Sequence, residues 1–188
     1  MKEILLGMVL GDGYLEPHGR GVRLEVIHSE SQKSYIEWKH EELRPLSPTP
    51  LHYHHRSKYP FWRFLTKIHP YLAQLREIFY VGGRKVVPDI IESLLTPPES
   101  LAVWFMDDGT CDKRQGSILF ETQCFPQIEI EKLQGCLWRN FGIRTNIHRS
   151  GRNRGLRLYV PVRESQKLKT IIEPYILPEL KYKLPRSP

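Results

Sequence analysis

The sequence predicts an α+β fold built from two similar halves, a pseudo-twofold pair of αββαββα subdomains. One observation behind this prediction is a repeated apolar stretch that ends in Asp-Gly, LLGMVLGDG at residues 5–13 and LAVWFMDDG at residues 101–109. Another is that further matching segments follow both stretches in the same order. Such co-linear repeats indicate a duplicated unit, with subdomains at residues 1–96 and 97–188.

The matching segments keep nearly constant spacing along the chain. They are KVVP with KLP (residues 85–88 and 183–185) and HPYL with EPYI (residues 69–72 and 173–176). Lys85 follows Asp12 by 73 positions, and Lys183 follows Asp108 by 75. A half of about 90 residues buries only a modest core. We therefore expect the two halves to be joined through the two central helices that end in Asp-Gly.

Hydrophobic periodicity predicts the same succession of elements in both halves. In the first half these are a strand at 22–28, a helix at 32–43, a hairpin at 51–56 and 59–65, and a helix at 71–79. In the second they are a strand at 117–123, a helix at 128–141, a hairpin at 143–148 and 156–160, and a helix at 164–172. The strands should form two antiparallel sheets, each with helices on one face and the other face open.

The Asp-Gly ends of the two central helices carry the chemistry. Glycine is expected there because it enters the left-handed conformation without a Cβ penalty. An Asp at a helix C-terminus is opposed by about 0.3–1 kcal/mol, so its repetition suggests a cation at both ends. Gly7 and Gly11, four residues apart, leave one helix face bare enough for close backbone approach.

If the two helices pack side by side, Asp12 and Asp108 meet. Two carboxylates ~6 Å apart repel by about 3 kcal/mol at an effective dielectric of 20. Lys85 and Lys183 could offset part of this, but hard divalent cations suit oxygen ligands better. Such ions polarise phosphoryl oxygens and lower the pKa of bound water. The bland alternative is two aspartates in ordinary turns, which the matched pair disfavours.

Composition points to a polyanionic partner. The chain carries 28 Lys and Arg against 21 Asp and Glu, a formal charge of +7, and basic residues concentrate between Arg144 and Lys169. A basic run is often only a solvated surface, and that alternative stays open. Together with the aromatic content and the paired acids, the charge favours nucleic acid.

Strand alternation then predicts which side chains face outward from the sheets. Arg, Asn, Gln and Glu on a two-stranded ribbon are the types that read base edges in a major groove, although any exposed strand face is polar. The residues predicted to contact DNA are Arg23, Glu25, His28, His54, Arg56, Arg63, Ser117, Glu121, Arg144, Asn146, His148, Arg152, Arg154, Arg157 and Tyr159. His52 and His54 share a face, but without a fixed fourth ligand DNA contact or solvation is favoured over zinc.

The cysteines and the N-terminus exclude other classes. Cys111, Cys124 and Cys136 form no Cys-x-x-Cys pair and are odd in number, so neither a zinc knuckle nor a disulfide framework is indicated. Neither a signal peptide nor a membrane span is found. The sequence predicts a soluble intracellular protein with reduced thiols, from a bacterial or archaeal cytoplasm or an organelle matrix.

At this point the residues resemble a known family. Residues 5–13 and 101–109 resemble the two signature helices of LAGLIDADG homing endonucleases in their single-chain, two-motif form. The segment from Leu95 to Gly109 is similar to the mitochondrial omega-intron type, as are TQCF at 122–125 and YKLP at 182–185. The signature at 101–109 departs from the family in having Val103 and Asp107 where small residues are usual.

The resemblance implies a monomeric endonuclease that makes double-strand breaks in a long DNA target by metal-dependent hydrolysis and so initiates intron mobility. The catalytic residues that it implies are Asp12, Asp108, Lys85, Lys183 and Gln123. Metal ligands would be Asp12 and Asp108, completed by the backbone carbonyls of Gly11 and Asp107. In the first half the equivalent of Gln123 falls near His28 or Ser29.

The implied cofactor is Mg²⁺, for which Mn²⁺ should substitute, while Ca²⁺ should support binding without cleavage. The implied partner is double-stranded DNA. Two alternatives keep the same fold: an intron-encoded RNA maturase, which would need neither aspartate, and a non-catalytic DNA-binding protein.

Overall fold

The computed structural model describes residues 1–151 and 155–186, so Arg152 and Arg154, both predicted to contact DNA, lie outside the described residues. The chain divides into two compact units. The first holds Asp12–Arg84 with Met1, and the second holds Lys2–Gly11 and Lys85–Pro188. Helix α1 (Lys2–Leu10), the first Asp-Gly helix, therefore packs within the second unit. The predicted subdomain boundary between residues 96 and 97 concerns the duplication and stays a prediction.

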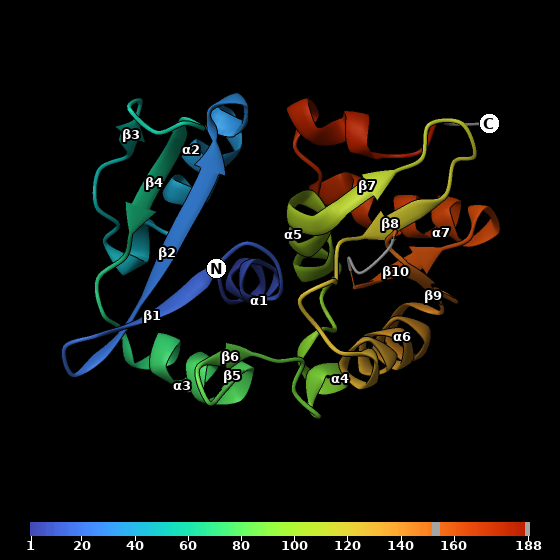
Figure 1. The fold of residues 1–188 in the computed structure, drawn as a ribbon, viewed down its shortest axis with the longest axis horizontal. Coiled ribbons are helices and arrows are strands. Elements are labelled where there is room, and N and C mark those ends of the chain that lie inside the picture. The colour runs from blue at the N-terminus through green and yellow to red at the C-terminus, as the bar shows by residue number, and fades with distance from the viewer. Residues whose placement is uncertain (152–154, 187–188) are drawn as a thin grey trace. The chain divides into compact units, whose positions relative to one another are not determined.

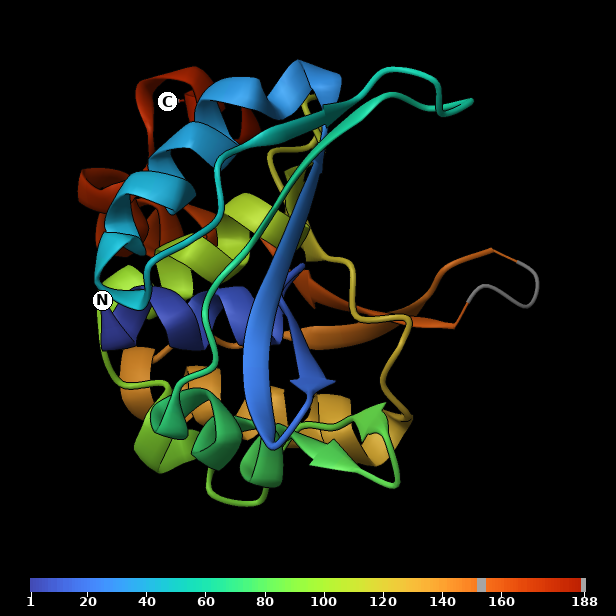
Figure 2. The ribbon, with the colours of Figure 1, turned by 90° about the vertical axis from the view of Figure 1, so that its left-hand side faces the viewer.

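The first unit contains a four-stranded antiparallel sheet in the order β1-β2-β4-β3 (Figure 1). Its strands are β1 (Tyr14–His18), β2 (Gly21–Ser29), β3 (His52–His54) and β4 (Phe61–Leu65). The helices are α2 (Lys33–Glu42) and α3 (Pro70–Phe79), and a short ladder of β5 (Tyr80–Val81) and β6 (Arg84–Lys85) follows. Figure 2 shows the connection between β3 and β4 extending past the end of the sheet.

The inner face of this sheet forms because apolar residues recur with the period of a strand. Val22, Leu24 and Val26 of β2 are buried, as are Tyr35 and Ile36 of α2, the helix that contacts β2. The predicted strand, helix and hairpin of the first half are therefore confirmed.

The second unit repeats the same order with its own sheet, β7-β8-β10-β9. Its strands are β7 (Gly109–Cys111), β8 (Ile118–Phe120), β9 (Asn146–Arg149) and β10 (Leu156–Val160). Its helices are α1, α4 (Ile91–Leu94), α5 (Pro98–Asp108), α6 (Gln127–Phe141) and α7 (Val162–Ile172). The identical strand order in both sheets confirms the predicted α+β fold with two αββαββα successions.

Helices α1 and α5 approach each other through glycine. A Cβ added to Gly7 would lie 2.5 Å from the carbonyl oxygen of Ser100 and 2.6 Å from Cβ of Val103. A Cβ added to Gly11 would lie 2.5 Å from Cβ of Asp107. The close backbone approach predicted from the two glycines is confirmed, and the larger residues of α5 fill the space that they leave.

Two details of the sequence prediction are wrong. Gly109 ends α5 at φ −80° and ψ 143°, which is extended rather than left-handed. Its missing side chain serves packing instead, because a Cβ there would lie 2.5 Å from the carbonyl oxygen of Phe105. The repeated HPYL and EPYI segments are not equivalent either. His69 caps the start of α3, whereas Glu173–Tyr175 is a 3₁₀ turn after α7.

Within the described residues, helices long and apolar enough to span a membrane are absent. The three cysteines are unpaired, as predicted, and burial raises the pKa of Cys136 to about 12.

Gly7→Ala should lower the free energy of unfolding. Forcing a methyl group against the Ser100 carbonyl costs about 1–3 kcal/mol, which exceeds the roughly 1 kcal/mol that alanine gains over glycine in a helix. Urea denaturation measures the change. Gly135→Ala in α6 is the control, because its Cβ would meet only the movable end of Arg139. Equal stability of the two variants would contradict the prediction.

Candidate functional site

The second Asp-Gly motif places its carboxylate beside a buried indole. Asp108 is the last residue of α5, and Nε1 of Trp104, one helical turn earlier, donates a hydrogen bond to its Oδ2 at 3.1 Å. Trp104 is fully buried and its ring lies 4.3 Å from that of Phe120 in β8. The packed indole therefore fixes one oxygen of the carboxylate.

Two lysines bind the carbonyl groups that precede the predicted catalytic aspartates. Nζ of Lys85 donates to the carbonyl oxygen of Gly11 at 2.7 Å. Nζ of Lys183 donates to the carbonyls of Met106 at 2.5 Å and Asp107 at 3.2 Å. Each cation thus sits at the negative end of a signature helix, where it is electrostatically favourable. This shared contact gives a structural reason for the repeated spacing from aspartate to lysine.

A pocket of about 350 Å³ lies at the end of α5. It is lined by Asp107, Asp108, Gly109, Thr110, Cys111, Lys113, Glu121, Tyr182 and Lys183. Its carboxylates offer the oxygen ligands that hard divalent cations prefer, so the donor set fits magnesium. Burial raises the pKa of the Cys124 thiol, the charge of Asp108 raises it further, and Lys85 acts the opposite way. The charges of Lys85 and Asp108 therefore both influence the pKa of the Cys124 thiol.

Gln123 follows β8 and is tied to the two inner strands of the second sheet. Its Nε2 donates to Oε2 of Glu121, whose carboxylate also pairs with Nε of Arg157 at 2.8 Å. A Cβ on Gly155 would lie 2.9 Å from both Cβ and the carbonyl oxygen of Gln123, so glycine is needed for this approach. The predicted catalytic role of Gln123 stays a prediction.

In the first unit Asp12 lies beside a buried histidine. Oδ2 of Asp12 is 3.8 Å from Nδ1 of His28, and Nε2 of His28 is 2.9 Å from Nζ of the fully buried Lys39. That Asp12 and Asp108 meet at one divalent-ion centre stays a prediction, since the two residues belong to different units.

The outer face of the first sheet carries ion pairs and aromatic contacts. Arg63 pairs with Glu25 at 2.6 Å, and Arg23 pairs with Glu16 on the neighbouring strand. The carboxylate of Glu16 has its pKa lowered by Arg23, its hydrogen-bond partner. These alternating charges give the face both donors and acceptors.

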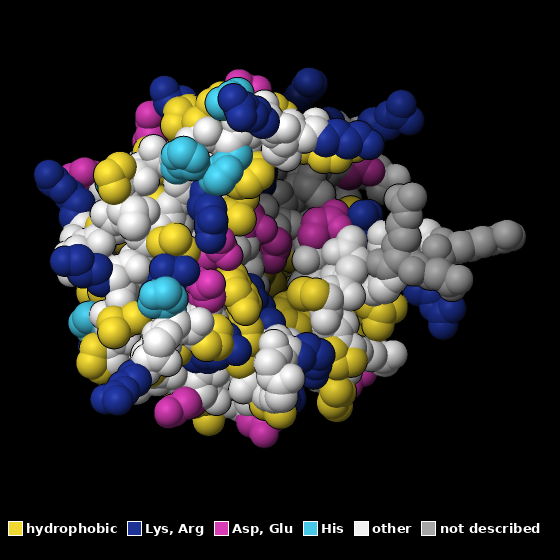
Figure 3. Space-filling model, turned by 60° about the vertical axis from the view of Figure 1, so that its left-hand side comes forward, with side chains coloured by type: hydrophobic (Ala, Val, Ile, Leu, Met, Phe, Trp, Pro, Cys, Tyr) yellow, Lys and Arg dark blue, Asp and Glu magenta, His cyan; other side chains and the backbone are white. Residues whose placement is uncertain are grey.

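Histidines extend this face along β3, and Figure 3 shows histidine side chains next to each other with basic and acidic groups nearby. The rings of His52 and His54 lie 4.5 Å apart, and that of His54 stacks on Phe61. Burial lowers the pKa of His54, and the charges of His52 and Arg63 lower it further.

The second sheet presents a comparable outer face. Asn146 and His148 of β9 are exposed, and the ring of His148 stacks on Tyr159 of β10 at 4.0 Å. Arg157, paired with Glu121, has the same outward parity as Tyr159. Arg56 and Arg144 are exposed outside the strands, and the guanidinium of Arg144 lies 4.6 Å from the ring centre of Trp138 in α6.

Two residues predicted to contact DNA are buried instead. His28 is 3% exposed because it shares the inward parity of Val22, Leu24 and Val26. Ser117 is 2% exposed; it lies one residue before β8, outside the strand to which alternation applies, and its carbonyl accepts from the amide of Asp112. Neither side chain is on an outer face.

The sequence reasoning also missed several residues. Ile27, 42% exposed, lies on the outer face of the first sheet opposite Arg63 of β4, which the alternation of β2 could have shown. Trp104 stands four residues before Asp108, a spacing that brings helical side chains together. Helical spacing puts Lys39 on the same face as Tyr35 and Ile36, but its contact with His28 joins a helix to a strand and gave no sequence signal.

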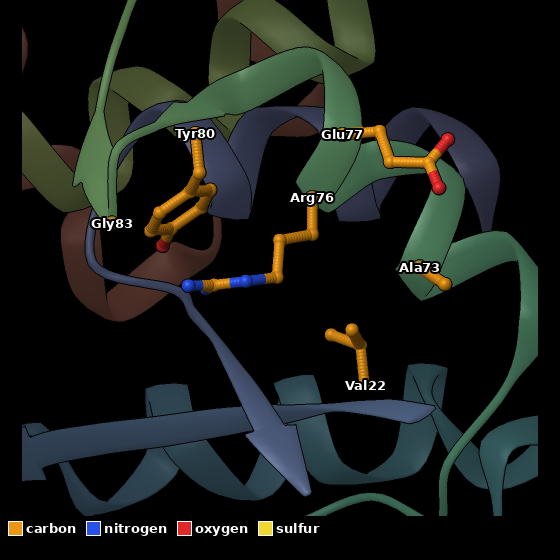
Figure 4. A pocket seen from close by; sticks show the side chains of 6 residues that line it. All are labelled: Val22, Ala73, Arg76, Glu77, Tyr80 and Gly83. Carbon is orange, nitrogen blue, oxygen red and sulfur yellow. The ribbon is translucent and has the colours of Figure 1, made fainter. Parts of the chain in front are cut away.

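A separate pocket in the first unit contains none of the predicted site residues. It measures about 270 Å³ and is lined by Val22, Ala73, Arg76, Glu77, Tyr80 and Gly83 (Figure 4). The guanidinium of Arg76 lies 4.4 Å from the ring centre of Tyr80 and donates to the carbonyl of Leu15. Arg76 thus joins α3 to β1.

The comparison with family models decides the class of protein. Residues 2–168 match the model of the LAGLIDADG DNA endonuclease family. The chain belongs to this family. The resemblance seen in the two Asp-Gly motifs is thereby confirmed.

Curated relatives match nearly the whole chain. A probable intron-encoded endonuclease 1 of Wickerhamomyces canadensis is 30% identical over 97% of this chain and 83% of its own length. Protein RecA of Mycolicibacterium chitae is 28% identical over 97% of this chain, which spans only 45% of that protein. A cytochrome b mRNA maturase bI2 of Debaryomyces hansenii is 27% identical over 98% of this chain and 73% of its own length.

Solved structures show the same fold. The homing endonuclease I-WcaI bound to its DNA recognition sequence matches with a TM-score of 0.84 and 28% identity, covering 100% of this chain and 86% of that one. I-DmoI in complex with DNA and Mn matches with a TM-score of 0.54 and 17% identity, covering 91% and 94%.

Lys183→Met should destabilise the protein modestly. Loss of the cation at the end of α5 removes about 0.3–1 kcal/mol of favourable interaction with the helix dipole, and Lys85→Met should do the same at α1. The free energy of unfolding from urea denaturation measures both. Lys181→Met, an exposed residue of the same 3₁₀ helix (Pro178–Lys183), is the matched control. An equal loss in the control would contradict the capping role.

Proposed function

We propose that the protein is a sequence-specific homing endonuclease that makes double-strand breaks in a long DNA target by metal-dependent phosphodiester hydrolysis, thereby initiating intron mobility. Membership of the LAGLIDADG DNA endonuclease family supports the proposal. So does the fold shared with I-WcaI, whose structure contains its DNA recognition sequence.

The observation that carries the proposal is a contact that recurs at the ends of α1 and α5, where a lysine binds a backbone carbonyl. Lys85 binds the carbonyl of Gly11 and Lys183 that of Asp107, the residues immediately before Asp12 and Asp108. Gly11 and Asp107 are themselves in close approach. Asp12 and Asp108 each come one residue after this contact, and consecutive Cα atoms are about 3.8 Å apart. That arrangement supports a shared divalent-ion centre.

Asp12 and Asp108 would hold the cation, with the carbonyl oxygens of Gly11 and Asp107 completing the coordination. Each carbonyl oxygen has two lone pairs, so one remains when a lysine occupies the other. When bound, a magnesium ion polarises a phosphoryl oxygen and lowers the pKa of a water. Mn²⁺ should substitute, and Ca²⁺ should support binding alone; I-DmoI has been solved with DNA and Mn.

The protein's own groups would do the rest. Lys85 and Lys183 place positive charge beside the scissile phosphates, where negative charge increases during hydrolysis. The outer faces of the two sheets would lie in the major groove. There the outward residues Arg63, Arg157 and Asn146 offer donors to base edges, and Glu25 offers acceptors. One acid in each half gives one reaction centre per strand, so a monomer suffices.

A second candidate is an RNA maturase that assists the splicing of its own intron. It is favoured by the similarity to the cytochrome b mRNA maturase of Debaryomyces hansenii. Such a function would use the basic surface but neither aspartate. Metal-dependent cutting of duplex DNA therefore discriminates the two functions.

Asp12→Asn and Asp108→Asn should each abolish double-strand cleavage while leaving DNA binding intact. Loss of one charged ligand at a reaction centre should slow hydrolysis by about a hundredfold or more. The target is first obtained by selecting cleaved sites from a randomised duplex library with magnesium. Cleavage is then measured in magnesium and binding in calcium.

Asp89→Asn is the matched control, because that carboxylate is 90% exposed and pairs only at the surface with Lys132. Normal cutting of both strands by either test variant would remove that aspartate from the mechanism. Splicing assistance retained by both variants, without DNA cleavage by the wild type, would favour the maturase.

Arg157→Ala should change base preference or affinity rather than turnover. An outward arginine that reads a base contributes about 1–3 kcal/mol of discrimination, and Arg157 lies on the outer face of β10. Binding across a library of single-base target variants measures this. Arg139→Ala, on α6 and paired with Glu92, is the control. An unaltered binding profile for Arg157→Ala would refute base reading.

A further inference from the structure

The two predicted catalytic aspartates have different neighbours, although their motifs are repeats. Asp108 accepts a hydrogen bond from the indole of Trp104. The position four residues before Asp12 is Met8, which has no N–H or O–H donor in its side chain. Asp12 lies instead near the imidazole of His28. The duplication has therefore produced two unlike environments for one chemical role.

Trp104 is a rigid donor. Its side chain is completely buried and its ring packs on Phe120 in a tilted contact 4.3 Å between centroids. An indole nitrogen can only donate, so the Nε1–H group aimed at Oδ2 of Asp108 cannot reverse its role. A buried side chain thus fixes one oxygen of the Asp108 carboxylate.

His28 is held from behind by a buried lysine. Lys39 is 0% exposed, and its Nζ lies 2.9 Å from Nε2 of His28 and 4.3 Å from the ring centre of Tyr35. This contact holds one imidazole nitrogen on the core side, so the ring presents its other nitrogen, Nδ1, away from Lys39. Nδ1 faces Oε1 of Gln32 at 3.2 Å and Oδ2 of Asp12 at 3.8 Å.

We propose that Trp104 positions Asp108 and that His28, oriented by Lys39, positions Asp12, so that a different buried partner sets the cutting rate of each strand. The inference rests on the proposed function, in which one aspartate serves each strand. None of the three partners would touch the DNA. They are positioning residues, which act through the carboxylates.

The test measures both strands of one duplex, each labelled at its 5′ end, with Trp104→Phe and Lys39→Met. Loss of a hydrogen bond to a charged group should slow one strand by roughly 10–100-fold in Trp104→Phe, with the other strand unchanged. Lys39→Met should slow the opposite strand. Nicked intermediates cut on opposite strands would then accumulate in the two variants.

Matched controls separate positioning from stability. Trp138→Phe removes a 47% exposed indole from α6, and Lys33→Met removes a 55% exposed ammonium from the same helix as Lys39. Both should cut like the wild type. His28→Phe keeps an aromatic ring and should show the strand bias of Lys39→Met, which covers the case in which Lys39→Met folds poorly. An equal slowing of both strands in the test variants would overturn the inference.

A second readout needs neither metal nor cleavage. In ¹H–¹⁵N spectra the indole resonance of Trp104, assigned through Trp104→Phe, should shift in Asp108→Ala, while those of the other tryptophans stay. Its failure to move would overturn the Trp104 arm whether or not DNA is cut. A wild type that cuts no duplex, with the resonance shift present, would instead refute the proposed function and, with it, the strand assignment.

Discussion

The backbone contact between α1 and α5 is the constraint on which the second unit depends. Gly7 and Val103 occupy equivalent places in the two motifs, as do Gly11 and Asp107, yet each pair joins a residue without a side chain to a larger one. The first motif has glycine at both places, and the side chains of Val103 and Asp107 in the second fill the space. The two motifs are repeats, but their contact is therefore not symmetric. Because the helices end immediately after this contact, it also decides where their terminal carbonyls lie.

Those carbonyls explain why a lysine must follow each motif at a similar distance. The end of a helix concentrates partial negative charge, and an aspartate there adds more. Lys85 and Lys183 arrive from distant segments and bind the carbonyls of Gly11 and Asp107. The two lysines therefore stabilise the helix ends in the free protein. In the proposed enzyme the same charges would stand beside the phosphates, so stability and chemistry place the same demand on these two positions.

Sequence patterns predicted most of the fold because periodicity reports which side of an element is buried. The alternation of Val22, Leu24 and Val26 predicted β2 correctly, and the same parity, applied strictly, would have placed His28 inside. Ser117 was misplaced because the predicted strand began one residue too early, and alternation does not hold beyond the end of a strand. The contact of Lys39 with His28 joins two elements, and local spacing carries no information about such pairs. Candidate residues within one helix were accessible to sequence reasoning, whereas their partners across the core were not.

The outer faces of the sheets have a further property that follows from their ion pairs. Arg63 and Arg157, both proposed to read bases, are each paired with a glutamate in the free protein. A phosphate alone would have to replace a carboxylate that is already well placed, which weakens attraction to DNA of arbitrary sequence. A site that also offers donors to Glu25 and Glu121, as cytosine does in the major groove, satisfies both members of each pair. Glu25 and Glu121 would therefore favour specificity over affinity. On a wrong DNA sequence, an arginine that binds the DNA would leave its glutamate unpaired.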